Sequence, residues 1–269
     1  MQIPPNPQRD RGSLGWRRKI CDWYYEFVDY FNFDREVVGV AMNYFDRYIS
    51  IASQKSCEDV NTLNTYQTVA ATALFLAIKL HSTSCEVCEE DTNLLRSRAL
   101  SKILYGSPTP QDIVDMEMNM LESLEWYVNP PTLHDFALMF SKLHPISNVC
   151  NQSGSYLYEA TRYQVELAIF MPEILVNFKS SVVVYAALKN AEEKIYAENP
   201  LVFTEEGKLS SLDAPEIHSS EMVDPTQVAQ CQIMLKRVCH QLPDLDYFSD
   251  SDGDRNVSNS PTTVVSFCM

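Results

Sequence analysis

The sequence predicts an all-α protein built from two tandem domains of five helices each. Apolar residues recur at helical spacing along most of the chain, and no long run alternates as a strand would. Only 7 of the 269 residues are glycine, and hydrophobic residues make up 45% of the chain, enough to fill a core in each domain. A segment at residues 129–132, Asn-Pro-Pro-Thr, interrupts the helical pattern and marks the boundary between the halves.

The first domain is expected to form around a helix at residues 68–80, TVAATALFLAIKL. Its alanines let neighbouring helices approach closely, and its other residues leave almost no polar face, which is typical of a helix buried on most sides. The stretch is too short to span a membrane and ends in a charge, Lys79. We therefore expect the central helix of a helical bundle, with an unexplained cation at its end.

Two helices are predicted before this central one. Residues 1–15 form a flexible tail, because they contain three prolines and two glycines. A first amphipathic helix follows from residue 16 to about residue 30, with apolar residues three and four positions apart. The second helix has an apolar face that repeats from Val38 to Ile49, and a polar connector at residues 57–65 follows it.

Two further helices complete the first domain. An acidic loop at residues 82–93 precedes a short helix at about 94–105. The fifth helix begins near Thr109, with Pro110 in its first position and Asp112 supporting its start.

The second half repeats this order of helices. Four of its helices can be placed from the apolar pattern, at residues 132–143, 155–170, 180–191 and 225–241. Residues 199–224 are polar and irregular, and residues 249–269 form an acidic tail without a core-forming pattern, which predicts disorder. Residues 70–79 and 180–189 match in their small and aliphatic side chains and in a terminal lysine, 110 positions apart (189 minus 79), which suggests a duplicated unit.

Composition excludes several classes of function. The formal net charge of −15 argues against binding to nucleic acid or to an anionic membrane, since both depend on concentrated Lys and Arg. Residues 1–15 lack the apolar core of a signal peptide, so we expect a location in the nucleus or cytoplasm. The eight cysteines should then be mostly reduced.

The sequence predicts neither an enzyme nor a cofactor. It lacks a recognisable nucleophile with its base and a glycine-rich phosphate loop. Cys85 and Cys88 form a C-x-x-C, with His81 four residues earlier. A structural zinc site needs four ligands and usually a second pair, so an ordinary loop or helix-end pair is favoured over a metal site.

Three consecutive motifs resemble the cyclin box. They are WRRKICDWYYEFVDYFNF, VVGVAMNYFDRYIS and TYQTVAATALFLAIKL, and NPPTLHDF matches the segment that leads into a cyclin's second box. The resemblance implies an N-terminal cyclin box at residues 16–128 and a C-terminal cyclin-like domain at 132–243. It also implies a regulatory subunit that binds and activates a cyclin-dependent protein kinase in cell-cycle control.

The resemblance explains the cation at the end of the central helix. In cyclins a lysine there and a glutamate on the fifth helix bind the backbone near the start of the kinase's regulatory helix; here these are Lys79 and Glu117. Neither charge is easily buried alone. Shifting Glu117 by 110 gives Gln227, so only the first domain keeps the pair. The implied kinase-binding residues are Lys79, Glu117, Leu76, Leu80, Leu121 and Val128.

Two further features follow from the resemblance. Arg17 and Asp46 correspond to a structural ion pair between the first two helices. A second surface matches the patch that docks short basic, leucine-containing motifs of substrates or inhibitors. Its residues are Trp16, Ile20, Trp23, Glu26 and Gln67, although Trp16 and Lys19 stand where smaller apolar residues are usual.

Several alternatives remain open at this point. Lys79 and Glu117 can form an ordinary internal salt bridge, and Ile20 and Trp23 can be core residues. The doubled fold also suits a transcription factor of the TFIIB type or an adaptor that binds no kinase. Ser260, before Pro261 in the acidic tail, is a candidate site for a proline-directed kinase.

Overall fold

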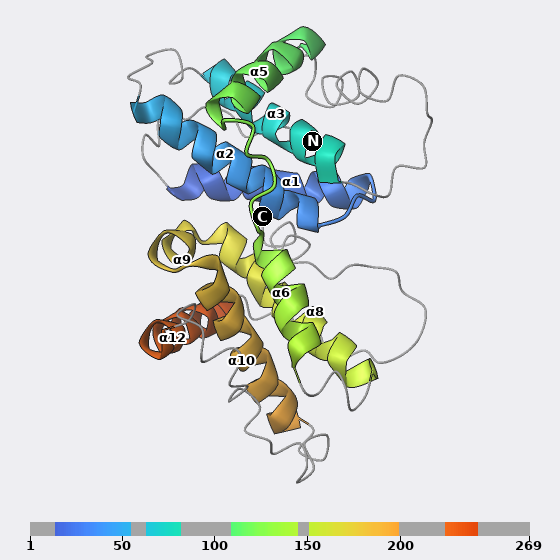
Figure 1. Cartoon of the computed structure of the whole chain (residues 1–269), viewed down its shortest axis with the longest axis vertical. Helices are drawn as coiled ribbons and strands as arrows, with labels where there is room; N and C mark the ends of the chain where they lie inside the picture. Colours follow the sequence, from blue (N-terminus) through green and yellow to red (C-terminus); the bar gives the residue numbers. More distant parts are fainter. Residues whose placement is uncertain (1–13, 55–62, 82–108, 145–150, 199–223, 242–269) are drawn as a thin grey trace. The chain divides into compact units, whose positions relative to one another are not determined.

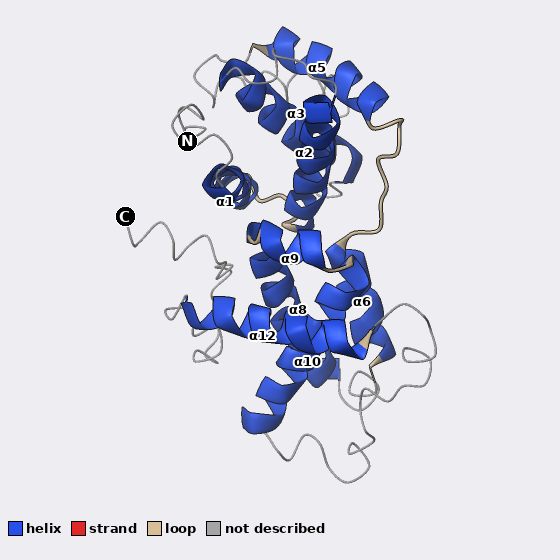
Figure 2. Cartoon of the chain, turned by 90° about the vertical axis from the view of Figure 1, so that its left-hand side faces the viewer, coloured by secondary structure: helices blue, strands red, loops and turns tan. Residues whose placement is uncertain are grey.

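The computed structural model describes residues 14–54, 63–81, 109–144, 151–198 and 224–241 (Figure 1). Every regular element in these ranges is an α-helix, which confirms the predicted all-α class (Figure 2). The chain divides between Pro130 and Pro131 into two compact units, called unit 1 and unit 2 below. The described residues contain no helix that is long and apolar enough to cross a membrane.

Four helices of unit 1 lie in the described ranges. They are α1 (Leu14–Tyr30), α2 (Glu36–Gln54), α3 (Leu63–His81) and α5 (Pro110–Ser123). The predicted central helix is α3, which packs against α2 and α5 (Figure 1). From Val69 to Ile78 every side chain of α3 is buried, as its apolar sequence predicts. A hydrogen bond of 2.8 Å from the buried Tyr24 hydroxyl to the Ala70 carbonyl joins α1 to α3.

Some boundaries in unit 1 differ from the prediction. Helix α1 begins at Leu14, two residues before the predicted start at residue 16. Helix α3 begins at Leu63, so the predicted connector at 57–65 was wrong over its last three residues. Packing explains the earlier start of α3, because the Tyr66 ring lies 6.4 Å from the Phe45 ring of α2. The rest of the predicted tail and the helix at 94–105 lie outside the described residues.

Unit 2 contains five helices in its described residues. They are α6 (Leu133–Leu143), α8 (Asn151–Phe170), α9 (Pro172–Asn177), α10 (Ser180–Glu198) and α12 (Pro225–Gln241). Helix α10 is the counterpart of α3 and packs against α6, α8 and α12 (Figure 1). The sequence analysis did not predict the short α9, and it ended α10 at residue 191. The helix continues to Glu198, and Ile195 in this extension is buried.

Capping residues define the starts of two helices. Thr109 and Asp112 form a capping box at α5, and Thr132 and Asp135 form the same arrangement at α6. Hydrogen bonds from the Thr109 hydroxyl and backbone N–H lower the pKa of Asp112. Each box satisfies two backbone donors that a helix start leaves unpaired. The predicted start of the fifth helix at Thr109 and Pro110 is confirmed.

Candidate partner-binding site

Lys79 and Glu117 form an ion pair between the end of α3 and the middle of α5. The Lys79 Nζ atom lies 2.6 Å from Glu117 Oε1, and 30% of the lysine side chain and 13% of the glutamate side chain are exposed. The same ammonium group lies 5.9 Å from the centre of the Phe75 ring, one helical turn earlier. The structure therefore brings together the two charges singled out in the sequence, in a partly buried site.

Apolar side chains of the same elements are exposed. Of the four predicted apolar contacts, Leu76 is buried, Leu121 and Val128 are half-buried, and Leu80 is exposed. The sequence prediction missed the other large apolar side chains that α5 and the following turn expose to solvent. These are Val114 at 41%, Met118 at 51%, Trp126 at 61% and Tyr127 at 54% exposure.

The pattern of α5 contained the signal for the missed residues. Ile113 and Met120 face the core, while Val114 and Met118 lie four positions apart on the opposite side. Neighbouring apolar side chains exposed on one face of a helix can mark a surface that a partner covers. Many protein-binding surfaces combine exposed apolar residues with a partly buried ion pair.

The predicted structural pair is present between α1 and α2. The Arg17 Nε atom lies 3.0 Å from both oxygens of Asp46, and an Nη atom lies 2.8 Å from Oδ2. The Arg17 side chain is only 12% exposed, while that of Asp46 is 41% exposed. Such a two-pronged contact orients both groups and fixes the crossing of the two helices.

The predicted docking patch is distributed between the core and the surface. Ile20 and Trp23 are buried, Glu26 is exposed and Gln67 is half-buried, while the side chain of Trp16 lies outside the described residues. The Trp23 ring packs against the Tyr24 and Phe27 rings, so the Trp23 side chain belongs to the core. The docking role of this patch remains a prediction.

An acidic group adjoins the patch. Burial and, secondly, the nearby Glu26 carboxylate raise the pKa of Asp22 to about 6, although Arg18 acts in the opposite direction. Asp22 and Glu26 lie four positions apart on α1, where residues share one face. This face of α1 therefore carries two acidic side chains, with Arg18 one helical turn before Asp22.

His81 has a structural role in the described residues. Its Nε2 atom lies 3.0 Å from the Tyr44 hydroxyl oxygen and 3.3 Å from the Val128 carbonyl oxygen. Cys85, Cys88 and Ser260 lie outside the described ranges. Within those ranges there is no group of three or more His, Cys, Asp or Glu residues that could hold a metal ion.

Unit 2 repeats part of the arrangement around Lys79. Lys189 lies over the Tyr185 ring, 5.6 Å from its centre, as Lys79 lies over Phe75. Lys189, however, forms no ion pair with any residue that the structure describes. The charged pair is thus confined to unit 1 in the described part of the chain.

In unit 2 the residue that corresponds to Glu117 is not Gln227, the residue 110 positions further along the chain. Gln227 is exposed. When α5 and α12 are aligned on their first prolines, Pro110 and Pro225, Glu117 instead corresponds to Gln232. The Gln232 amide donates to Asn190 Oδ1 over 3.1 Å, and Asn190 also donates to Gln164. The amides of Gln232 and Asn190 therefore join α12 to α10 at this position, and an ion pair between Lys236 and Glu193 joins the same two helices further along.

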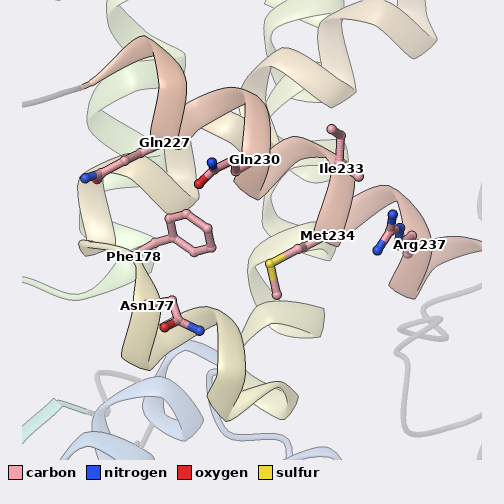
Figure 3. A pocket seen from close by; sticks show the side chains of 7 residues that line it. All are labelled: Asn177, Phe178, Gln227, Gln230, Ile233, Met234 and Arg237. Carbon is pink, nitrogen blue, oxygen red and sulfur yellow. The ribbon is translucent and has the colours of Figure 1, made fainter.

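An open groove lies on unit 2 between α12 and the end of α9 (Figure 3). Figure 3 shows Phe178 and Asn177 on one side and the side chains of α12 on the other. The lining residues are Asn177, Phe178, Gln227, Gln230, Ile233, Met234 and Arg237. This lining contains amides, apolar groups and one cation, without a carboxylate.

Fold and site together define an all-α protein of two helical units, the first of which carries a charged pair beside exposed apolar residues. Residues 4–129 match the family described as cyclin, N-terminal domain. The G1/S-specific cyclin CLN2 of Candida albicans is 27% identical over 188 residues, which is 67% of this chain and 37% of the relative. Over residues 4–129, just under half of its length, the chain is thus similar to the N-terminal domain of the cyclin family.

Further comparisons agree with this similarity. The G1/S-specific cyclin-D2 of Gallus gallus is 28% identical over 120 residues, or 45% of this chain and 36% of the relative. The crystal structure of a viral cyclin from herpesvirus saimiri has a TM-score of 0.56 at 16% identity, and the match covers 84% of this chain and 86% of that chain. The latter likeness supports the fold. The chain spans little more than a third of the length of these two curated relatives.

Proposed function

We propose that this chain is a regulatory subunit that binds and activates a cyclin-dependent protein kinase in control of the cell cycle. The observation that carries the proposal is the partly exposed Lys79–Glu117 pair, next to the exposed apolar residues Leu80 and Met118. The two relatives named above support the cell-cycle role, because they are G1/S-specific cyclins.

The pair retains hydrogen-bonding capacity for a partner's backbone. Among the described residues, Lys79 Nζ makes one hydrogen bond, to Glu117 Oε1, whereas an ammonium group has three donors and a carboxylate accepts several bonds. A helix end presents unpaired N–H or C=O groups that such an acceptor and donor can satisfy. Lys79 and Glu117 would therefore bind a helix end of the kinase, while the neighbouring apolar side chains pack on that helix.

Activation would follow from differential binding. A kinase is active when a glutamate of its regulatory helix pairs with the catalytic lysine and its activation loop is ordered. A partner that binds the inward position of this helix more tightly than the outward one shifts the population toward the active state. An interface of standard size, about 1,600 Å² in total, would be sufficient for a specific complex.

The test is a kinase assay with purified proteins and a matched control. Lys79→Glu and Glu117→Ala should each abolish kinase activation, because each leaves the other charge without its partner in the interface. Lys189→Glu is the control, since Lys189 has the same position over an aromatic ring in unit 2. It should leave activation unchanged. Full activation by folded Lys79→Glu protein would refute the proposal.

Two experiments test the alternative functions. A salt-dependent shift of promoter DNA would favour a transcription factor of the TFIIB type, which the net charge of −15 opposes. Capture of the chain's partners followed by mass spectrometry should recover a cyclin-dependent kinase. Recovery of other proteins without a kinase throughout the cell cycle would favour an adaptor.

A further inference from the structure

The turn that follows α5 has an uncommon backbone conformation. Glu125 and Trp126 have φ angles of 53° and 60°, which lie in the left-handed region. This region is uncommon for residues other than glycine and costs of order 1 kcal/mol or more for each, especially for a bulky side chain. The Trp126 N–H donates to the Leu121 carbonyl over 2.9 Å, which closes the end of α5. Other groups must hold two such residues in place.

Arg47 of α2 holds both ends of this turn. One Nη atom donates to the Tyr127 carbonyl over 2.8 Å, and the other donates to the Leu124 carbonyl over 3.3 Å. The guanidinium group also lies 5.3 Å from the centre of the Tyr127 ring. A single side chain therefore brackets Glu125 and Trp126 on either side.

Tyr44 and His81 hold Val128, the residue that follows Tyr127. The Tyr44 hydroxyl donates to the Val128 carbonyl, and His81 Nε2 lies within 3.3 Å of the same oxygen. Burial raises the pKa of Tyr44 to about 12, so its hydroxyl remains a donor at neutral pH. Together with Arg47, these contacts attach the turn to α2 and to the end of α3.

The turn adjoins the Lys79–Glu117 pair. His81 lies two residues after Lys79 on α3, and Leu121 lies four residues after Glu117 on α5, about 6 Å along the helix axis. At this place Trp126 is 61% exposed. An exposed tryptophan whose backbone is held in place is typical of a residue that contributes strongly to binding, because the turn that carries it loses little conformational freedom in the complex.

We infer that Arg47 is a positioning residue, which holds the turn at residues 124–128 so that Trp126 stands exposed beside the Lys79–Glu117 pair for contact with the kinase. The inference rests on the proposed function for the identity of the partner. It assigns to Arg47 an effect on binding that acts through Trp126 and is separate from any effect on the stability of unit 1.

A double-mutant cycle of kinase affinity tests this coupling. Arg47→Met keeps most of the side-chain stem and removes the donors, and Trp126→Ala removes the contact. Each should weaken binding of the full chain about 10-fold or more. The double variant should be no more than about two-fold weaker than Trp126→Ala, because Arg47 acts through that residue. Losses that simply multiply in the double variant would overturn the inference.

Arg17→Met is the matched control, because Arg17 pairs with Asp46, the residue next to Arg47. The affinity loss in the Arg17→Met, Trp126→Ala double variant should equal the product of the two single losses. Thermal unfolding of every variant should be measured together with its affinity. If Arg17→Met showed the same coupling to Trp126 as Arg47→Met, a general loss of stability would explain both and the positioning role would be refuted.

A measurement on the free chain separates this inference from the proposed function. With 5-fluorotryptophan incorporated, the ¹⁹F signal absent from Trp126→Ala identifies Trp126. The line width of this signal should decrease in Arg47→Met, because loss of the Arg47 hydrogen bonds lets the turn move faster. It should stay unchanged in Arg17→Met, which leaves those bonds in place. An unchanged signal in Arg47→Met would refute the positioning role whatever the partner. A wild-type chain that binds no cyclin-dependent kinase would overturn the proposed function and, with it, the partner assigned to Trp126.

Discussion

The Nζ atom of Lys79 lies 2.6 Å from Oε1 of Glu117, although 38 positions separate the two residues in the chain. Exchanging the charges, Lys79→Glu together with Glu117→Lys, should restore the internal ion pair but reverse the donor and acceptor offered to a partner. We expect thermal stability close to that of the wild type and no kinase activation. Recovery of activation in the exchanged variant would show that the pair has only an internal role.

Asp46→Asn should destabilise unit 1 through the contact with Arg17. Arg17 is 12% exposed at its side chain, and its Nε and an Nη atom both lie within 3.0 Å of the Asp46 carboxylate. Loss of this charge-assisted contact should lower the free energy of unfolding by about 2 kcal/mol. Urea denaturation at neutral pH measures the change. A difference below about 0.5 kcal/mol would show that solvent screens the pair.

Glu125→Gly should stabilise the chain, because glycine adopts a φ of 53° without the steric cost that glutamate pays. The expected gain is up to about 1 kcal/mol in the free energy of unfolding. Glu122→Gly is a matched control, since Glu122 lies within α5, where glycine should cost about 1 kcal/mol. Destabilisation by both substitutions would contradict a strained turn. Thermal melting of the two variants makes the comparison.

Stability should depend on pH through Asp22. Its pKa in the folded chain is about 6, above the ordinary value of 3.8, mainly because of burial and secondly because of Glu26. The folded state therefore holds this proton more tightly than the unfolded state, so the contribution of Asp22 is complete below pH 4 and is lost as the pH rises through about 6.

Asp22→Asn should remove this dependence. Above pH 6 the variant should be the more stable by about 1 kcal/mol, a value reduced for the solvent exposure of the group. Denaturant midpoints at pH 5 and pH 7.5 measure the effect for both proteins. An equal difference between variant and wild type at the two pH values would contradict a raised pKa.

Much of the helical architecture could be predicted because it depends on local patterns. The buried run in α3 and the capping pair Thr109–Asp112 are visible in a few consecutive residues, and both agree with the structure. The prediction failed where packing decides. Helix α9 is only six residues long, and the start of α3 includes a turn that its contact with α2 supports. Short helices gain most of their stability from such contacts.

In the candidate site, too, some residues could be predicted from the sequence and others could not. Lys79 and Glu117 were singled out because charges beside apolar helices are unusual and because they match a cyclin motif. Trp126 was missed, since an aromatic residue after a helix is ordinarily expected in a core. Only its left-handed backbone and its exposure reveal it. The replacement of Glu117 by Gln232 in unit 2 also required the registers of α5 and α12.

By itself the sequence determined the all-α class, indicated a boundary at residues 129–132 and drew attention to Lys79 and Glu117, because helical periodicity, prolines and charges beside apolar runs are properties of neighbouring positions. Tertiary structure alone decided that Arg47 of α2 reaches the carbonyls of Leu124 and Tyr127. Those groups lie about 80 positions further along the chain, and a long side chain finds such partners only after two helices have packed.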